Sequence, residues 1–247
     1  FDTTFEALDL SDPETGVGWS APWFQILSLS YKPTHVIAVW PDEQELRLPD
    51  ETLGIASTRM IGSLELGTTP TLPLQQIVVE GTEAALASSQ GWSADVAAAQ
   101  VALRERGDAG PAPAGDPAYD FAVTLTGFAP QSAEIERLRS LIGLPETIDT
   151  LSAELTVGFD KAWDRSAIED RRPQPRDREI TGLQARWGEL ALAGSGRLTV
   201  DAAGVGTGEL NLEATNWRDI LALAEASGAL PEAQVPLVRG ALETLAR

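Results

Sequence analysis

The sequence contains no cysteine, one histidine and one methionine. Without cysteine there can be no disulfide, thiolate zinc site, iron–sulfur cluster or cysteine nucleophile. A metal site would have to be built from oxygen ligands, yet no calcium-loop motif of the form D-x-[DN]-x-[DN]-G occurs. We therefore expect no metal site and no cofactor, although the lack of cysteine does not fix the cellular compartment.

Basic residues are also scarce, with 18 Lys and Arg against 37 Asp and Glu, a net charge of −19. Nucleic-acid affinity depends largely on cationic side chains that displace counterions from phosphates, so this composition excludes a nucleic-acid partner. Anionic membrane surfaces would repel the chain for the same reason. The hydrophobic fraction of 43% is high enough for a sizeable core and excludes general disorder.

Motifs for enzymatic chemistry are missing as well. No G-x-S-x-G nucleophile elbow occurs, and the alternating glycines Gly204, Gly206 and Gly208 do not form a phosphate-binding G-x-G-x-x-G. His35 follows a tight turn and lies on the same side of the strand as Ile37 and the valine two residues further on. This pattern favours a residue of a hairpin over a catalytic base. Carboxylate pairs of the glycosidase kind stay open, but their spacing singles none out. We expect no catalytic residue and no enzyme.

The chain has neither an initiator methionine nor a run of about 20 apolar residues. It opens with F-D-T-T-F-E-A-L-D-L and ends within A-L-E-T-L-A-R, which is typical of a helix. We expect a portion of a longer protein, trimmed at both ends. The absence of a leader or anchor then applies to this portion and not to the longer protein.

Alternation of apolar and polar residues dominates what is present. Residues 151 to 159 place Leu, Ala, Leu, Val and Phe on one face and polar residues or glycine on the other, which predicts a strand with one solvated side. The alanine-rich stretch 91–106 is ambiguous, and we predict a strand for its second half. The other predicted strands cover 24–31, 35–40, 45–48, 54–66, 76–80, 119–126, 180–186 and 190–200, with a hairpin turn at 201–204.

Three helices are expected among the strands. The first covers 132–142 and stops at Gly143, the second begins after a capping Asn216 and ends at Gly228, and the third begins at Pro231. Residues 119–146 and 208–232 share an order of strand, aromatic residue, helix and Gly-Leu-Pro-Glu-like ending, which raises the possibility of an internal repeat. A Gly- and Pro-rich stretch at 106–118 predicts a long loop or a domain boundary.

Aromatic residues are the remaining candidates for a binding site. Each buried Trp removes about 150–250 Å² from water, so such residues are usually anchors of a core. The alternative is that they line an apolar groove between a curved sheet and its helices. Under either interpretation, the candidate residues are Trp23, Phe24, Tyr31, Trp40, Trp187 and Trp217.

One family resemblance emerges from these segments. The stretch D-P-E-T-G-V-G-W-S-A-P-W-F-Q-I-L-S-L-S-Y-K-P-T-H-V-I-A-V-W-P, with L-P-E-T-I-D-T-L at 144–151, R-R-P-Q-P-R at 171–176 and residues 194–225, resembles the alphaproteobacterial family known as domain of unknown function 2125. The likeness covers nearly the whole chain, and residues 82–118 match only loosely. It implies that Trp23, Tyr31, His35 and Trp40 are signature positions of a hairpin.

The resemblance also implies a cellular setting. Members look like envelope proteins with an N-terminal hydrophobic segment, and they are similar at a distance to AsmA-like envelope proteins, whose long sheets form apolar grooves implicated in lipid handling. That second step is an analogy between folds. It implies a location on the periplasmic side of the inner membrane, with membrane association only through a segment absent from this chain.

These observations predict a single elongated β-rich domain over residues 1–247. We expect a long, curved, mostly antiparallel sheet of about 10–12 strands with two or three helices packed on it. The preferred function is non-enzymatic binding or guiding of lipid-like apolar ligands in a β-groove. The alternatives are a structural or protein-interaction module of the cell envelope, whose partner is another envelope protein, and, more weakly, a carboxylate-based hydrolase.

Overall fold

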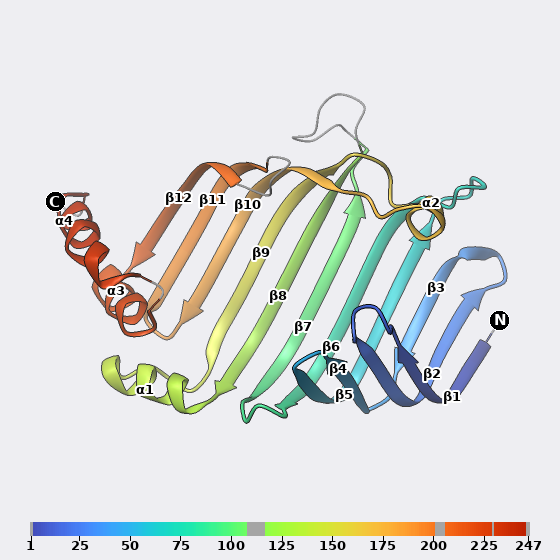
Figure 1. Cartoon of the computed structure of the whole chain (residues 1–247), viewed down its shortest axis with the longest axis horizontal. Coiled ribbons are helices and arrows are strands. Elements are labelled where there is room, and N and C mark those ends of the chain that lie inside the picture. Colours follow the sequence, from blue (N-terminus) through green and yellow to red (C-terminus); the bar gives the residue numbers. More distant parts are fainter. Residues whose placement is uncertain (1, 108–116, 201–205, 229, 246–247) are drawn as a thin grey trace.

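The chain forms one large antiparallel sheet of twelve strands, with most of its helical residues gathered at one corner (Figure 1). The structure is a computed structural model, and it describes residues 2–107, 117–200, 206–228 and 230–245. The expected fold class is therefore confirmed. The strands are β1 (Asp2–Ser11), β2 (Gly18–Leu29), β3 (Lys32–Trp40), β4 (Glu43–Leu48), β5 (Glu51–Leu66), β6 (Leu74–Ser88), β7 (Ser93–Glu105), β8 (Ala118–Gln131), β9 (Ile148–Phe159), β10 (Pro175–Trp187), β11 (Leu190–Val200) and β12 (Gly206–Thr215).

Strand order follows chain order. The sheet reads β1-β2-β3-β5-β6-β7-β8-β9-β10-β11-β12, and the short strand β4 pairs with β2 and β5 beside this path. Neighbours in sequence are therefore neighbours in space, as is common for antiparallel meanders. The ambiguous alanine-rich stretch is strand in both halves, because β7 runs from Ser93 to Glu105 and pairs with β6 and β8.

The helices are α1 (Ala133–Ile142), the single turn α2 (Ser166–Glu169), α3 (Trp217–Ala226), the 3₁₀ turn η1 (Glu232–Gln234) and α4 (Val235–Leu245). The Ser132 side chain accepts a hydrogen bond from the Ile135 backbone N–H and caps α1, and Gly143 ends that helix with a positive φ of 70°. Asn216 stands at the start of α3 but caps nothing. Its φ is 57°, and its side-chain amide donates to the Glu189 backbone oxygen instead.

The two segments considered as a repeat share their order of elements. Strand β8 leads into α1 just as β12 leads into α3, although the two helices begin with different backbone conformations. Most of the long loop expected at 106–118, and the hairpin turn expected at 201–204, lie outside the described residues.

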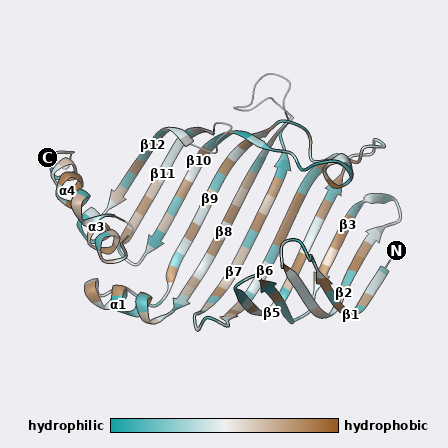
Figure 2. Cartoon of the chain, viewed as in Figure 1, coloured by the Kyte–Doolittle hydropathy of each residue, from teal (hydrophilic) through white to brown (hydrophobic). Residues whose placement is uncertain are grey.

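The two faces of the sheet differ sharply in chemistry. Residues that are paired across strands project to the same face, and successive residues alternate between faces, so the register assigns each side chain to one side. One face, called the apolar face here, carries aliphatic and aromatic residues on every strand; the polar face carries most of the charges. Figure 2 shows the resulting bands of opposite hydropathy along the strands. Representative rows of the apolar face are Leu64–Ile77–Leu103–Phe121–Leu155, Gly62–Val79–Val101–Val123–Ala153 and Leu151–Ala185–Leu192–Ala214.

A line of backbone irregularities keeps the same face apolar along the longer strands. Pairing is interrupted beside Glu83 and Gly127, whose φ angles are 47° and 62°. At this line two successive residues point to the polar side: Thr58 and Arg59 are both exposed, whereas Ser57 before them is buried. The alternation then resumes with its phase changed, as at a β-bulge.

The sheet is a single layer over most of its width. The solvent-accessible surface of the chain is 15224 Å², against about 10,600 Å² for a compact monomer of the same mass. Side chains on the central strands are mostly half-buried because they pack against same-face neighbours without a second layer above them. The apolar face is therefore largely uncovered.

One segment does cross the apolar face. Residues 160–174, called the strap here, leave β9, reach the start of β6 and return to β10 (Figure 1). The Leu74 backbone N–H donates to the Trp163 oxygen at 2.6 Å, and the Arg165 N–H donates to the Thr71 oxygen at 2.9 Å. The strap therefore covers one end of the apolar face near β6, β8 and β9.

Candidate functional site

The centre of the candidate site is a shallow trough on the apolar face. It has a volume of about 260 Å³ and crosses five consecutive strands, β8 to β12. Leu212, on the edge strand β12, is 57% exposed, so the trough opens to solvent. The lining residues, called the trough here, are Val123, Leu125, Leu151, Ser152, Ala153, Leu183, Gln184, Ala185, Leu192, Gly194 and Leu212.

Charged side chains are confined to the margins of this face. Over the described residues of β5 to β12, the register places three on the apolar side, namely Glu51, Glu105 and Arg178, each close to the end of its strand. Glu51 accepts a hydrogen bond from the indole N–H of Trp92 at 2.7 Å. The middle of the face therefore offers dispersion contacts and apolar burial, and no ionic recognition.

Aromatic packing closes the strap end of the face. Tyr119 is fully buried, and its hydroxyl accepts a hydrogen bond from the Trp163 backbone N–H at 3.0 Å. The rings of Tyr119, Phe159 and Trp163 form a chain of edge-to-face contacts with centroid distances of 5.7 Å. Burial raises the pKa of Tyr119 above its ordinary value of 10.0. This hydroxyl therefore holds the strap as a neutral group.

A second aromatic cluster lies near the N-terminal end of the sheet. Phe24 packs edge-on against both Trp19 and Trp40, with ring centroids 5.3 Å apart in each pair. The Trp19 indole N–H donates to the side-chain oxygen of Gln44 at 2.8 Å, and that amide is itself buried. Here strands β2 to β5 pack their apolar sides together, so this part of the face is a small core.

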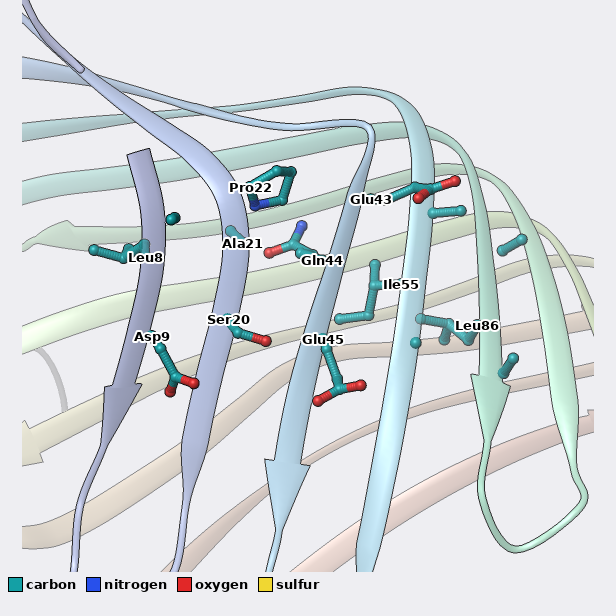
Figure 3. Close-up of a pocket in the computed structure, with 15 residues that line it drawn as sticks. Leu8, Asp9, Ser20, Ala21, Pro22, Glu43, Gln44, Glu45, Ile55 and Leu86 are labelled. Atoms are coloured by element: carbon teal, nitrogen blue, oxygen red, sulfur yellow. The ribbon is translucent and has the colours of Figure 1, made fainter. Parts of the chain in front are cut away.

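A larger and more polar depression crosses β1, β2, β4, β5 and β6 (Figure 3). Its volume is about 690 Å³, and small residues such as Ala21, Gly54 and Ala85 contribute to its lining. Asp9 and Glu45 lie on it, and both pair with the guanidinium of Arg47. Glu43 also lies on this lining, so three carboxylates and one guanidinium surround the depression.

The six aromatic candidates from the sequence do not form one site. Phe24 and Trp40 belong to the N-terminal cluster, whereas Trp23 points to the polar face opposite Glu6. Tyr31 lies in the turn between β2 and β3 and is 83% exposed.

The last two candidates lie at the opposite corner of the sheet. Trp187 ends β10 and donates its indole N–H to the Pro145 oxygen at 2.9 Å. Trp217 begins α3 and carries the Arg218 guanidinium 4.4 Å from its ring centre. The trough of β8 to β12 is lined mainly by aliphatic residues and not by these rings.

His35 lies on the polar face, in the hairpin predicted for it. Its Nδ1 is 3.6 Å from a carboxylate oxygen of Glu65, whose other oxygen accepts a hydrogen bond from Lys32 at 2.9 Å. The Lys32 hydrogen bond lowers the pKa of Glu65. Among the described residues, no three His, Asp or Glu side chains are grouped so as to hold a metal ion.

The molecule is thus a single-layer antiparallel sheet protein whose candidate site is an uncovered apolar face. The chain belongs to the bacterial family described as uncharacterized protein conserved in bacteria (DUF2125), whose model matches residues 1–247. No curated protein and no solved structure matches the chain. Within the described residues, no helix is both long and apolar enough to span a membrane.

Proposed function

We propose that this protein is a non-enzymatic component of the bacterial cell envelope that binds or guides lipid-like apolar ligands on its apolar face. The observation that carries the proposal is the uncovered apolar surface that runs across β5 to β12 and contains the trough. Water in contact with such a surface is replaced favourably by hydrocarbon.

The size of this face is the first argument. Strands of 10 to 16 residues rise about 3.3 Å per residue, and neighbouring strands are about 4.8 Å apart. One side of the sheet from β5 to β12 therefore measures roughly 1,500 Å². The largest apolar patch of a typical soluble monomer is about 300–600 Å², and larger ones mark binding sites.

The shape of the trough is the second argument. A lipid acyl chain occupies about half of a bilayer core of about 30 Å, so it is about 15 Å long. Five adjacent strands span about 19 Å at their usual spacing. A hydrocarbon chain is therefore no longer than the trough is wide, and Leu183, Leu192 and Leu212 offer it apolar contacts.

The cellular setting rests on the family. Its description places it in bacteria, and the resemblance to AsmA-like envelope proteins favours the periplasmic side of the inner membrane. The net charge of −19 disfavours adsorption of the whole chain to anionic membrane surfaces. A protein partner of the envelope that covers the same face is the competing proposal.

A blocking variant tests the proposal. Ala185 lies between Leu151 and Leu192 in the trough, so Ala185→Trp would fill it. Displacing two methylene groups of a bound chain costs about 1.6 kcal/mol, or roughly tenfold in affinity. The matched control is Ala122→Trp on the polar face, opposite Ala102 and Glu154. The affinity of each variant for methyl palmitate would be measured by displacement of a fluorescent fatty-acid ester.

The expected result is weaker binding for Ala185→Trp and wild-type binding for Ala122→Trp, with both variants folded by circular dichroism. If wild-type protein binds no acyl ligand, or if both variants bind as wild type, the trough is not the binding site and the interaction module becomes the better account.

A further inference from the structure

The strap region has an unusual charge content for so acidic a chain. Six of the 18 basic residues lie between residues 160 and 179. Three of them are paired with carboxylates: Arg171 with Asp160 at 2.8 Å, Arg165 with Glu169 at 2.6 Å, and Lys161 with Asp170 at 3.5 Å. Arg172, Arg176 and Arg178 remain, and within the described residues no ion pair joins them to a carboxylate.

Of these three arginines, Arg178 is the one that has a paired residue in the register of β10 with β9. Strand β10 pairs Arg178 with Val157 of β9, and both alternate with residues of the apolar face such as Ile180. Its neighbour Glu179 points the other way and pairs with Arg197 on the polar face at 3.1 Å. Arg178 is half-buried. The register of β9 and β10 therefore places this guanidinium on the apolar face.

Partial burial of a guanidinium beside aliphatic residues, without a carboxylate partner, carries an unfavourable desolvation free energy. An anionic ligand bound to the guanidinium would offset it. Arg178 lies on the same strand and the same face as Leu183 of the trough. Because one residue between them is taken up by a β-bulge, the separation is about four strand positions, or about 13 Å. An acyl chain of about 15 Å spans that gap.

We propose that Arg178 binds the anionic headgroup of a single-chain amphiphile whose hydrocarbon tail lies along β10 into the trough. This inference rests on the proposed function and adds to it the ligand class and its orientation. The shared chemistry is a carboxylate or phosphate attached to a hydrocarbon chain. A guanidinium recognises both through paired N–H donors.

Three ligands with the same 16-carbon chain separate the two parts of the account. Methyl palmitate is neutral, palmitate carries a carboxylate, and palmitoyl lysophosphatidate carries a phosphate. Their dissociation constants would be measured at concentrations below micelle formation, with the folded state of each variant checked by circular dichroism. Arg178→Met keeps the apolar stem but removes the charge, and Arg178→Lys keeps a cation. Arg186→Met, on the polar face of the same strand, is the matched control.

We expect Arg178→Met to weaken the binding of palmitate or lysophosphatidate by about 10- to 100-fold, as the loss of a charged hydrogen bond would. The affinity for methyl palmitate should stay unchanged. The anion whose affinity falls more in Arg178→Met identifies the headgroup. Arg178→Lys should recover part of the loss, and Arg186→Met should bind as wild type. Equal effects on all three ligands, or none on either anion, would overturn the headgroup site alone. Failure of wild-type protein to bind any of them would overturn the proposed function as well.

Discussion

The hydroxyl of Tyr119 should hold the strap against the sheet. It accepts a hydrogen bond from the Trp163 backbone N–H at 3.0 Å in a fully buried position. Tyr119→Phe keeps the ring and its edge-on packing with Phe159 but leaves that N–H without an acceptor. An unsatisfied buried donor costs about 1–3 kcal/mol. We expect the free energy of unfolding to fall by that amount.

The assay is urea unfolding followed by tryptophan fluorescence, with hydrogen exchange at the Trp163 amide as a local probe. At a slope of about 3 kcal/mol per molar urea, the midpoint should fall by roughly 0.3–1 M. Tyr31→Phe is the control, because Tyr31 is 83% exposed and should change nothing. If both variants unfold at the wild-type midpoint and the Trp163 amide exchanges at its wild-type rate, the hydroxyl does not anchor the strap.

The same residue predicts a pH effect. Because burial raises the pKa of Tyr119, the folded state binds this proton more tightly than the unfolded state does. Its contribution to stability is complete below the ordinary pKa of 10.0 and is lost as the pH rises through the raised value. Tyrosinate absorbance should therefore show a late-titrating tyrosine in wild type that is missing in Tyr119→Phe.

Two further predictions concern the sheet and the strap. Gly196→Ala should lower the free energy of unfolding by about 1–3 kcal/mol, because its Cβ would collide with the backbone of β12. The control Gly54→Ala has room for a Cβ and should be tolerated. The two variants would be compared by their urea midpoints, and equal midpoints would contradict the register of β11 and β12. Hydrogen bonds from the Gln174 backbone N–H and from Arg171 lower the pKa of Asp160 below 3.8. Asp160 therefore stabilises the strap above that pH and loses its effect as the pH falls through the lowered value, so the destabilisation caused by Asp160→Asn should be larger at pH 7 than at pH 3. A pH-independent difference would contradict this cause.

Much of the sheet could be predicted from sequence because alternation is a local signal. The run from Leu151 to Phe159 indicates which side chains share a face before any partner strand is known. The alanine-rich strand β7 was harder, since alanine favours helices and only pairing with β6 and β8 settles its conformation.

The composition of the site was less predictable. In plain alternation Trp19 and Phe24 would lie on opposite faces of β2, yet their rings pack 5.3 Å apart. The pairing of β1 with β2 is interrupted beside Ala7, whose φ is 51°, and the phase of the alternation changes there. No residue type marks such an interruption, because neighbouring strands impose it.

The strap is a long-range feature with no local sequence signal. Its contact with β6 joins Leu74 to Trp163, and nothing in either segment specifies the other. The position of Arg178 has the same origin: its face is set by the register between β9 and β10. In sequence it is one arginine among several in a mixed-charge segment. The trough itself depends on five strands being adjacent, which only the assembled sheet provides.

The most direct test of the central claim is native mass spectrometry of the protein purified from bacteria without detergent, followed by solvent extraction and lipid analysis. Lipid binding by the apolar face predicts a defined mass increment from one or more co-purifying acyl lipids, reduced in Ala185→Trp and retained in Ala122→Trp. A ligand-free mass that persists after incubation with liposomes would contradict lipid binding by the apolar face.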